Sequence, residues 1–255
     1  MKIDEARRYK GTYEGLLGKI IRGPVIHADE TKAKIIGSNG YVWVFANSEE
    51  VVFTFSENRE ASTPHRILEG FSGVLVSDFY GVYDSIDCPQ QKCLIHLIRD
   101  INENICKQPF NQELKEIGAQ FANLLRPIIE SVDRFGLKAR HLQKYKKAVA
   151  QFYRTLLQRT CTTDIAAGYQ RRFEKNRDRL FTFLDHDGIP WNNNNAEHAI
   201  KAFARLRNVI GGTSTAKGME EYLILLSISE TCKNKGVRFL NFLMSEESDV
   251  DSFVS

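Results

Sequence analysis

The sequence predicts an α/β fold, in which a mixed sheet is flanked by helices and an all-helical segment interrupts the chain before its last part. Residues 25–55 hold three short runs rich in β-branched and aromatic side chains, and a helix-like segment connects them to a further apolar run at 73–78. Residues 111–185 instead repeat apolar side chains every three or four positions, as helices do. A helix between strands favours a parallel crossover within the sheet.

The composition is that of a globular chain that can bury a substantial core, with 255 residues of which 42% are hydrophobic. No run of about 18 apolar residues could span a bilayer. Residues 1–8 lack the apolar centre of a secretory signal, so we expect a cytoplasmic protein with no membrane partner. The five cysteines are scattered and include no Cys-x-x-Cys pair, which argues against a disulfide framework and a four-cysteine zinc site.

Residues 1–22 form a lead-in to the sheet. An amphipathic helix is predicted over 3–22, and Gly23-Pro24 ends it because proline disfavours helix at the preceding residue. Residues 23–110 form the first part of the α/β core. Its first strands are a predicted three-stranded meander, since β-branched and aromatic residues fit a pleated, half-buried surface; they lie at 25–31, 41–46 and 51–55.

A short helix at 63–70 follows the meander, with threonine and proline at its start and glycine at its end. The apolar run 73–78 is a predicted buried strand that ends in Asp78. Lys92 to His96 reads as another buried strand, which leads into a helix from about Leu97 to Lys107.

The predicted helical insertion at 111–185 contains two or three helices and carries a concentration of basic charge. Between Arg134 and Leu180, 13 Lys and Arg stand against three Asp and Glu, an excess of ten positive charges. The whole chain has a net charge of +3, so the remaining residues together carry −7. Such a block is typical of an element that binds a polyanion, because Lys and Arg contact phosphates and release counterions; the alternative is a solvated helical surface. Candidate phosphate contacts in this block are Lys144, Lys147, Arg171 and Arg172.

Residues 186–245 form the last part of the α/β core. A run of four asparagines after Trp191 precedes residues with helical spacing, and asparagine side chains can satisfy free backbone N–H groups at a helix start. We therefore expect Glu197 in the first turn or two of a new helix. Two further helices are predicted, at about 219–233 and 239–244, and the acidic, serine-rich tail 246–255 is expected to be frayed.

One face of the predicted Glu197 helix carries both an acid and cations. Lys201 and Arg205 follow Glu197 by four and eight residues, and Asn194 precedes it by about one turn. The face is either a metal-binding acid beside phosphate-binding groups or an ordinary solvated face with an ion pair.

Three acids point to the chemistry. Asp29 and Asp78 stand in or at the end of predicted strands, and Glu197 stands near a helix start, so the fold could bring them together. Three carboxylates repel one another unless they hold hard divalent cations, and two such ions about 4 Å apart clamp the attacking and leaving oxygens of a phosphoryl transfer. We expect two Mg2+ ions, with Mn2+ as a substitute. For each acid taken alone, the alternative is a turn or cap residue.

Two histidines are candidates to support the metal ligands. His27 precedes Asp29 by two residues and shares its strand face, where it either orients the carboxylate or packs. His96 forms a Cys-x-x-His pair with Cys93, but two ligands cannot complete a tetrahedral zinc site, so we expect a buried thiol and a hydrogen-bonded histidine. Arg99, three residues further on, is a candidate contact for a phosphate.

Five motifs follow one another along the chain. They are Ala28-Asp29-Glu30-Thr31; Phe71-Ser72-Gly73-Val74-Leu75 leading to Asp78 and Tyr80-Gly81-Val82-Tyr83; Cys93-x-x-His96-x-x-Arg99; Asn193-Asn194-x-Ala196-Glu197; and Gly211 with the closing helices. Each motif is weak alone. The ordered set, over roughly residues 13–245, resembles the catalytic domain of transposases of the insertion sequence 66 family.

The resemblance implies an RNase H-like core with a helical insertion before the last acid, and a DDE triad of Asp29, Asp78 and Glu197 as catalytic residues and metal ligands. It also implies DNA 3′-end cleavage and strand transfer with two divalent ions. The implied partners are transposon ends and target DNA, on which the protein would assemble as a homo-oligomer in the bacterial nucleoid. The candidate DNA contacts are then Arg99, Asn194, Lys201, Arg205, Lys144, Lys147, Arg171 and Arg172.

Some features depart from the family pattern. His198 and Ala202-Phe203 stand where members usually have an arginine and an arginine-proline pair, while Lys201 keeps the basic role. Members usually carry a long N-terminal region that binds transposon ends, whereas about twenty residues precede the first strand here, so we expect a catalytic part without its recognition part. Two other functions stay open: a DNA-binding remnant without catalysis, and an RNase H-like nuclease that cuts without joining.

Overall fold

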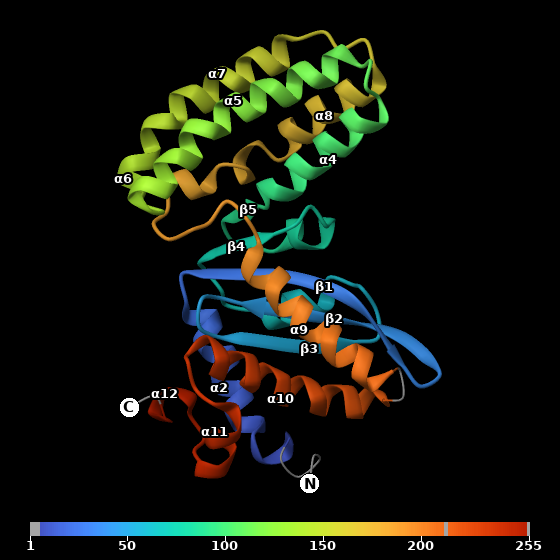
Figure 1. The fold of residues 1–255 in the computed structure, drawn as a ribbon, viewed down its shortest axis with the longest axis vertical. Coiled ribbons are helices and arrows are strands. Elements are labelled where there is room, and N and C mark those ends of the chain that lie inside the picture. Colours follow the sequence, from blue (N-terminus) through green and yellow to red (C-terminus); the bar gives the residue numbers. More distant parts are fainter. Residues whose placement is uncertain (1–5, 212–213, 254–255) are drawn as a thin grey trace. The chain divides into compact units, whose positions relative to one another are not determined.

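The structure is a computed structural model that describes residues 6–211 and 214–253. The chain forms two compact units, Met1–Cys88 with Asn193–Ser255, and Pro89–Asn192. The predicted α/β class is confirmed, with a mixed, RNase H-like sheet flanked by helices (Figure 1). In the described residues, no helix is both long and apolar enough to cross a bilayer.

A mixed sheet lies at the centre of the first unit. Strands β1, β2 and β3 form the predicted antiparallel meander, and β4 lies parallel to β1 on its other side, so these strands follow the order β3-β2-β1-β4. The predicted helix α3 (Ser62–Ile67) precedes β4 and makes the crossover. The strands are β1 (Val25–Ile35), β2 (Ser38–Ala46), β3 (Val51–Ser56) and β4 (Val74–Ser77).

Alternation along β2 divides the core of this unit into two clusters, because successive side chains of a strand point to opposite faces. Val42 and Val44 pack in one cluster with Phe203 of α9. Trp43 and Phe45 pack in the other, on the face covered by α2. The remaining helices of the unit are α2 (Lys10–Arg22), α9 (Asn194–Ile210), α10 (Ala216–Asn234), α11 (Phe239–Ser245) and α12 (Val250–Phe253).

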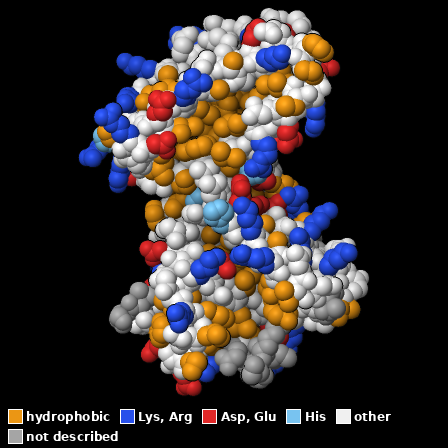
Figure 2. Space-filling model, viewed as in Figure 1, with side chains coloured by type: hydrophobic (Ala, Val, Ile, Leu, Met, Phe, Trp, Pro, Cys, Tyr) orange, Lys and Arg blue, Asp and Glu red, His pale blue; other side chains and the backbone are white. Residues whose placement is uncertain are grey.

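The second unit is mainly helical, as predicted for residues 111–185. Phe121, Phe152 and Phe173 meet with ring centroids 5.0 to 5.9 Å apart and join α5, α7 and α8. Figure 2 shows hydrophobic side chains gathered over the helices of this unit. Its elements are β5 (Gln90–Lys92), α4 (Leu94–Lys107), α5 (Gln112–Phe135), α6 (Ala139–Leu142), α7 (Lys146–Gln158), α8 (Asp164–Lys175) and the short 3-10 helices Gln143–Tyr145, Arg177–Arg179 and Thr182–Leu184.

The strand predicted over 92–96 is wrong. β5 ends at Lys92 and α4 begins at Leu94, so His96 lies in the first turn of a helix. A short apolar run cannot distinguish a buried strand from a buried helix segment. Here the buried positions Leu94, Leu97 and Ile101 have helical spacing, which decides the outcome.

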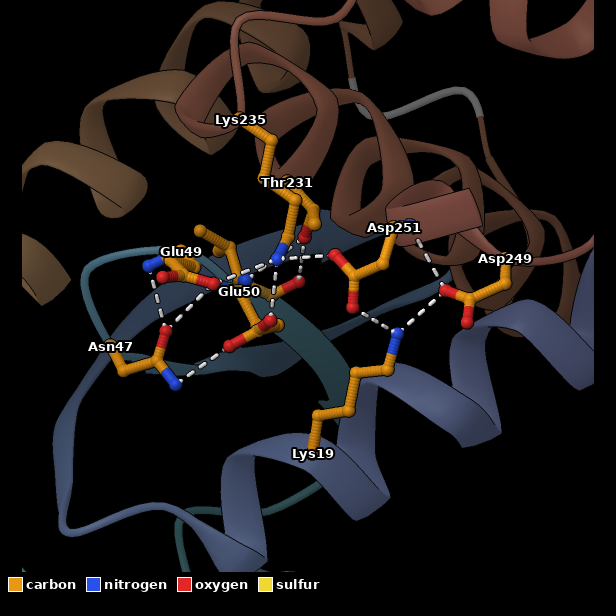
Figure 3. Close-up of polar contacts among 9 residues, drawn as sticks. Lys19, Asn47, Glu49, Glu50, Thr231, Lys235, Asp249 and Asp251 are labelled. Carbon is orange, nitrogen blue, oxygen red and sulfur yellow. Dashed lines mark hydrogen bonds and ion pairs between the residues drawn. The ribbon is translucent and has the colours of Figure 1, made fainter. Parts of the chain in front are cut away.

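The prediction of a frayed C-terminal tail is also wrong for residues 246–253. Val250 is buried, and Lys19 of α2 contacts both Asp249 and Asp251 at 2.6 Å. Asp251 also contacts Lys235 at 2.7 Å (Figure 3). Composition indicates disorder only where a segment has no partners. Here two lysines from distant positions hold the acidic segment in place.

Candidate active site

Asp29 and Asp78 emerge from neighbouring parallel strands at the same level. The β1–β4 pairing ends with His27 opposite Val76. Each acid follows the last residue of the β1–β4 pairing on its strand by two positions, and Asp78 comes directly after β4. Because side chains two residues apart on a strand share a face, the sheet presents both acids at one edge of the parallel pair.

Asp29 lies on the sheet face that α9 covers. Its cross-strand partner is Val44, which belongs to the cluster packed against Phe203 of α9. The helix is amphipathic, and Ala196 and Ala199 bury its inner side next to β1 and β2. Small side chains at these positions let the backbones of helix and sheet approach closely, so the start of α9 lies near the acids.

Asn193 fixes the start of α9 to β1. Its side chain is completely buried, its Nδ2 donates a hydrogen bond to the backbone oxygen of Ala28 at 2.9 Å, and its Oδ1 lies 3.1 Å from Nδ1 of His27. Since Nδ2 of Asn193 is used as a donor, its oxygen accepts and His27 carries the proton on Nδ1. The backbone N–H of Glu197, one turn later, donates to Asn193 O at 3.1 Å. The third acid is thus connected to the strand that carries the first.

This role differs from the one predicted for the asparagine run. Asn193 occupies the N-cap position of α9, but it makes no side-chain capping bond. Its amide is used across the fold instead, on residues about 165 positions away. The N-cap preference correctly located the helix start, whereas the long-range partners of Asn193 have no local sequence signal.

His27 is neutral at physiological pH. Burial lowers its pKa to about 4, and the hydrogen bond with Asn193 opposes this shift only in part. A neutral histidine adds no positive charge beside Asp29. His27 therefore contacts Asn193, and its predicted support of a metal ligand stays a prediction.

The electrostatics show that the acids are close enough to influence one another. The pKa of Asp29 is raised to about 7, first by burial and then by the nearby carboxylates of Glu30, Asp78 and Glu197. The backbone N–H of Glu30 donates to Asp29 Oδ1 at 2.8 Å and partly opposes the rise. Converging acids of this kind fit hard divalent cations, which would offset their mutual repulsion through oxygen ligands.

The site is open rather than a closed cage for one ion. Within residues 6–211 and 214–253, the three acids do not form a set whose ligand atoms all lie within 4.8 Å of one another. Asp29, Asp78 and Glu197 are each partly exposed. The carboxylate oxygens are the donor type that hard divalent ions prefer.

The polar side chains predicted on α9 face solvent. Asn194, Lys201 and Arg205 are all exposed, and the two cations continue the Glu197 face at four-residue steps. Gly211, which closes the last motif, ends the helix in the left-handed conformation with φ of 63°. The helix therefore carries an acid at its start and exposed cations further along.

The basic residues of the second unit divide into paired and exposed sets. Arg172 contacts Asp100 at 2.7 Å, so this candidate already has an anionic partner. Similar ion pairs engage Lys138, Lys146 and Arg159. Among the residues described, Lys144, Lys147 and Arg171 are exposed and make no ion pair, and Arg99 of α4 is exposed as well. Fewer cations are therefore available to a polyanion than the number of Lys and Arg residues in the block suggests.

Cys93 and His96 also belong to the second unit. Cys93 is buried at the N-cap of α4, and His96 is half-buried in its first turn. The sequence-based expectation of a buried thiol is confirmed for Cys93. The support of a metal ligand by His96 stays a prediction.

Two adjacent parallel strands that present acids, with a third acid on a helix packed over the same sheet, define an RNase H-like protein with an acidic site. The family model described as "Transposase IS66 family" matches residues 3–221. The match covers most of the chain, and the chain belongs to this transposase family.

A curated relative matches a shorter stretch. An uncharacterized protein of Sinorhizobium fredii, y4jO, is 24% identical over 142 residues, which are 47% of this chain. The aligned part is 43% of that relative, so the chain spans less than half of its length.

Proposed function

We propose that this chain is the catalytic part of a DDE transposase that cleaves DNA 3′ ends and joins them to a target, with Asp29, Asp78 and Glu197 as metal ligands. The observation that carries the proposal is the arrangement of the elements that bear the three acids. Asp29 and Asp78 stand two residues beyond the end of one parallel strand pair, and Asn193 connects the Glu197 helix to the same strand. The raised pKa of Asp29 supports it, because Asp78 and Glu197 are among the carboxylates that contribute to that shift.

When bound, two Mg2+ ions, or Mn2+ as a substitute, would activate the attacking oxygen and stabilise the leaving oxygen. The residues of the chain prepare for this chemistry. Without metal, partial burial and the neighbouring acids disfavour the ionised form of Asp29. The binding of cations is therefore coupled to the loss of its proton. His27 stays neutral and holds Asn193, which holds the helix of Glu197.

DNA is the proposed polyanion. On the helix of Glu197, Asn194, Lys201 and Arg205 would contact phosphates. Arg99, Lys144, Lys147 and Arg171 of the second unit would add further contacts, with Arg172 dependent on release from Asp100. Transposon ends and target DNA are the proposed substrates, and assembly on DNA as a homo-oligomer is part of the same proposal. Family membership supports DNA as partner.

The test uses Glu197→Gln beside Glu220→Gln, a matched change of an exposed glutamate on α10. Nicking of supercoiled DNA and joining of pre-cut ends are measured in Mg2+, together with DNA affinity in EDTA. Glu197→Gln should abolish both reactions and leave DNA affinity equal or slightly higher, because one negative charge is lost while the cations stay. Nicking at the parent rate by Glu197→Gln would remove the third acid from the proposal. Nicking without joining by the parent would favour a nuclease that only cuts.

A further inference from the structure

The pairing between β1 and β4 does not reach the two acids of the sheet. The last residues paired between β1 and β4 are His27 and Val76, so Asp29 and Asp78 lie beyond the end of the ladder. A shared cation site requires the two carboxylates to keep a constant separation. Other contacts of the described residues must therefore set this distance.

Each of the two acids accepts a hydrogen bond from a backbone N–H close to it in sequence. Glu30 N donates to Asp29 Oδ1 at 2.8 Å, and Tyr80 N donates to Asp78 Oδ1 at 2.8 Å. The orientation of both carboxylates thus depends on where Glu30 and Tyr80 lie.

Arg59, in the segment after β3, joins Glu30 to Tyr80. Its Nε donates to Glu30 Oε1 at 3.0 Å, and a second guanidinium nitrogen contacts the same oxygen. The guanidinium carbon lies 3.7 Å from the ring centroid of Tyr80, whose hydroxyl donates to the backbone oxygen of Arg59 at 2.7 Å. A planar guanidinium can stack on an aromatic ring and bind a carboxylate at once, which an ammonium group cannot do.

Tyr83 makes a second link between the same segments. It lies in the 3-10 helix Gly81–Ser85 that follows Asp78, and its hydroxyl donates to Glu30 Oε2 at 2.6 Å. Its ring is fully buried and meets the ring of Trp43, the cross-strand partner of Glu30, at 6.1 Å in an edge-on arrangement. Glu30 lies on the sheet face opposite Asp29, because neighbouring residues of a strand alternate in direction. Its side chain is 1% exposed.

We propose that Glu30, Arg59, Tyr80 and Tyr83 form a clamp that sets the separation and orientation of Asp29 and Asp78, so that Arg59 and Tyr83 are positioning residues of the metal site. The inference rests on the proposed function. It explains why two tyrosines, at positions 80 and 83, accompany the second acid, since each contacts either Arg59 or Glu30. Arg59 also offsets the charge of Glu30, which would otherwise add to the repulsion among the acids.

The test is Tyr83→Phe, which removes the hydroxyl that Glu30 accepts and keeps the buried ring. Tyr13→Phe is the matched control, because Tyr13 donates its hydroxyl to the backbone oxygen of Phe53 at 2.9 Å in the same unit. Binding of Mn2+ is followed by electron paramagnetic resonance, with thermal unfolding and DNA affinity in EDTA measured beside it. Tyr83→Phe should weaken Mn2+ binding about tenfold, the scale seen when a residue that orients a metal ligand is removed. DNA affinity should stay at the parent value, and Tyr13→Phe should bind Mn2+ like the parent.

Two further variants separate geometry from folding and charge. Tyr80→Phe removes only the bond to the backbone of Arg59 from a half-buried side chain, so it tests the clamp if Tyr83→Phe does not fold. Arg59→Lys keeps the charge but loses the planar fork, and should also weaken Mn2+ binding. Parent-like Mn2+ affinity in folded Tyr83→Phe, or in Tyr80→Phe if the first variant does not fold, would overturn the clamp while leaving the proposed function intact. A parent that binds Mn2+ no better than Asp78→Asn would overturn both.

Discussion

The side-chain amide of Asn193 donates to the backbone oxygen of Ala28 at 2.9 Å, and this bond connects the helix of the third acid to the strand of the first. Both partners are completely buried. The bond closes a loop of 165 residues that contains the whole second unit. The position of Glu197 therefore depends on the polar contacts of Asn193 as well as on the packing of α9.

Asn193→Ala should destabilise the fold and weaken the site together. The change leaves the Ala28 oxygen and His27 Nδ1 without their partner inside the protein, which costs about 1 to 3 kcal/mol. Chemical denaturation measures the loss, and Mn2+ titration measures the effect on the acids. Asn194→Ala is the control, because Asn194 is exposed one residue later. Equal stability of the two variants would show that the Asn193 bonds do not fix the helix.

The pKa of Asp29 predicts the pH dependence of the metal-free protein. Because the folded-state pKa is raised from an ordinary value of 3.8 to about 7, the fold favours the neutral carboxyl. The contribution to stability is fully present below about pH 4 and is lost as the pH rises through about 7. Unfolding in EDTA across this range should show the decline in the parent and not in Asp29→Asn. A parallel decline in both proteins would assign the effect to another group.

The exposed cations of the second unit should bind DNA phosphates. Lys144→Gln with Lys147→Gln should weaken binding and reduce the dependence of log affinity on log salt concentration by about 0.9 for each phosphate that the variant no longer neutralises. Lys10→Gln with Lys115→Gln removes the same charge from exposed positions outside the block and serves as the control. If log affinity depends on log salt concentration equally in the two double variants, the basic block is a solvated surface and not a DNA contact.

The acidic C-terminal segment should stabilise the fold at pH values above the pKa of Asp251. Hydrogen bonds and charges from Lys19 and Lys235 lower the pKa of Asp251 below its ordinary 3.8, so its contribution is present above that value and is lost as the pH falls through the folded pKa. Asp251→Asn should cost about 1 kcal/mol or less at pH 7, since the side chain is 46% exposed and screened by solvent. Thermal unfolding from pH 7 to 2 tests this, with Glu247→Gln as an exposed control. If the parent still unfolds at a higher temperature than Asp251→Asn at pH 2, the stabilisation does not come from the ion pairs.

The local pattern of the sequence predicts the elements and the three acids, whereas long-range partners decide how the site is held. The β-branched and aromatic run at 41–46 predicts β2, in which residues 42–46 are all buried. The hydrogen bonds of Tyr83 with Glu30 and of Asn193 with Ala28 join residues 53 and 165 positions apart. No periodicity within a helix or strand carries such information, and for this reason Arg59, which belongs to no motif, was not predicted.

The central claim is that Asp29, Asp78 and Glu197 share divalent cations. Anomalous diffraction from crystals soaked in Mn2+ tests it most directly, because it locates the ions independently of activity. We expect two anomalous peaks about 4 Å apart, bound by carboxylate oxygens of these three residues. Peaks at other side chains, or an absence of peaks at the three acids at saturating Mn2+, would contradict the account.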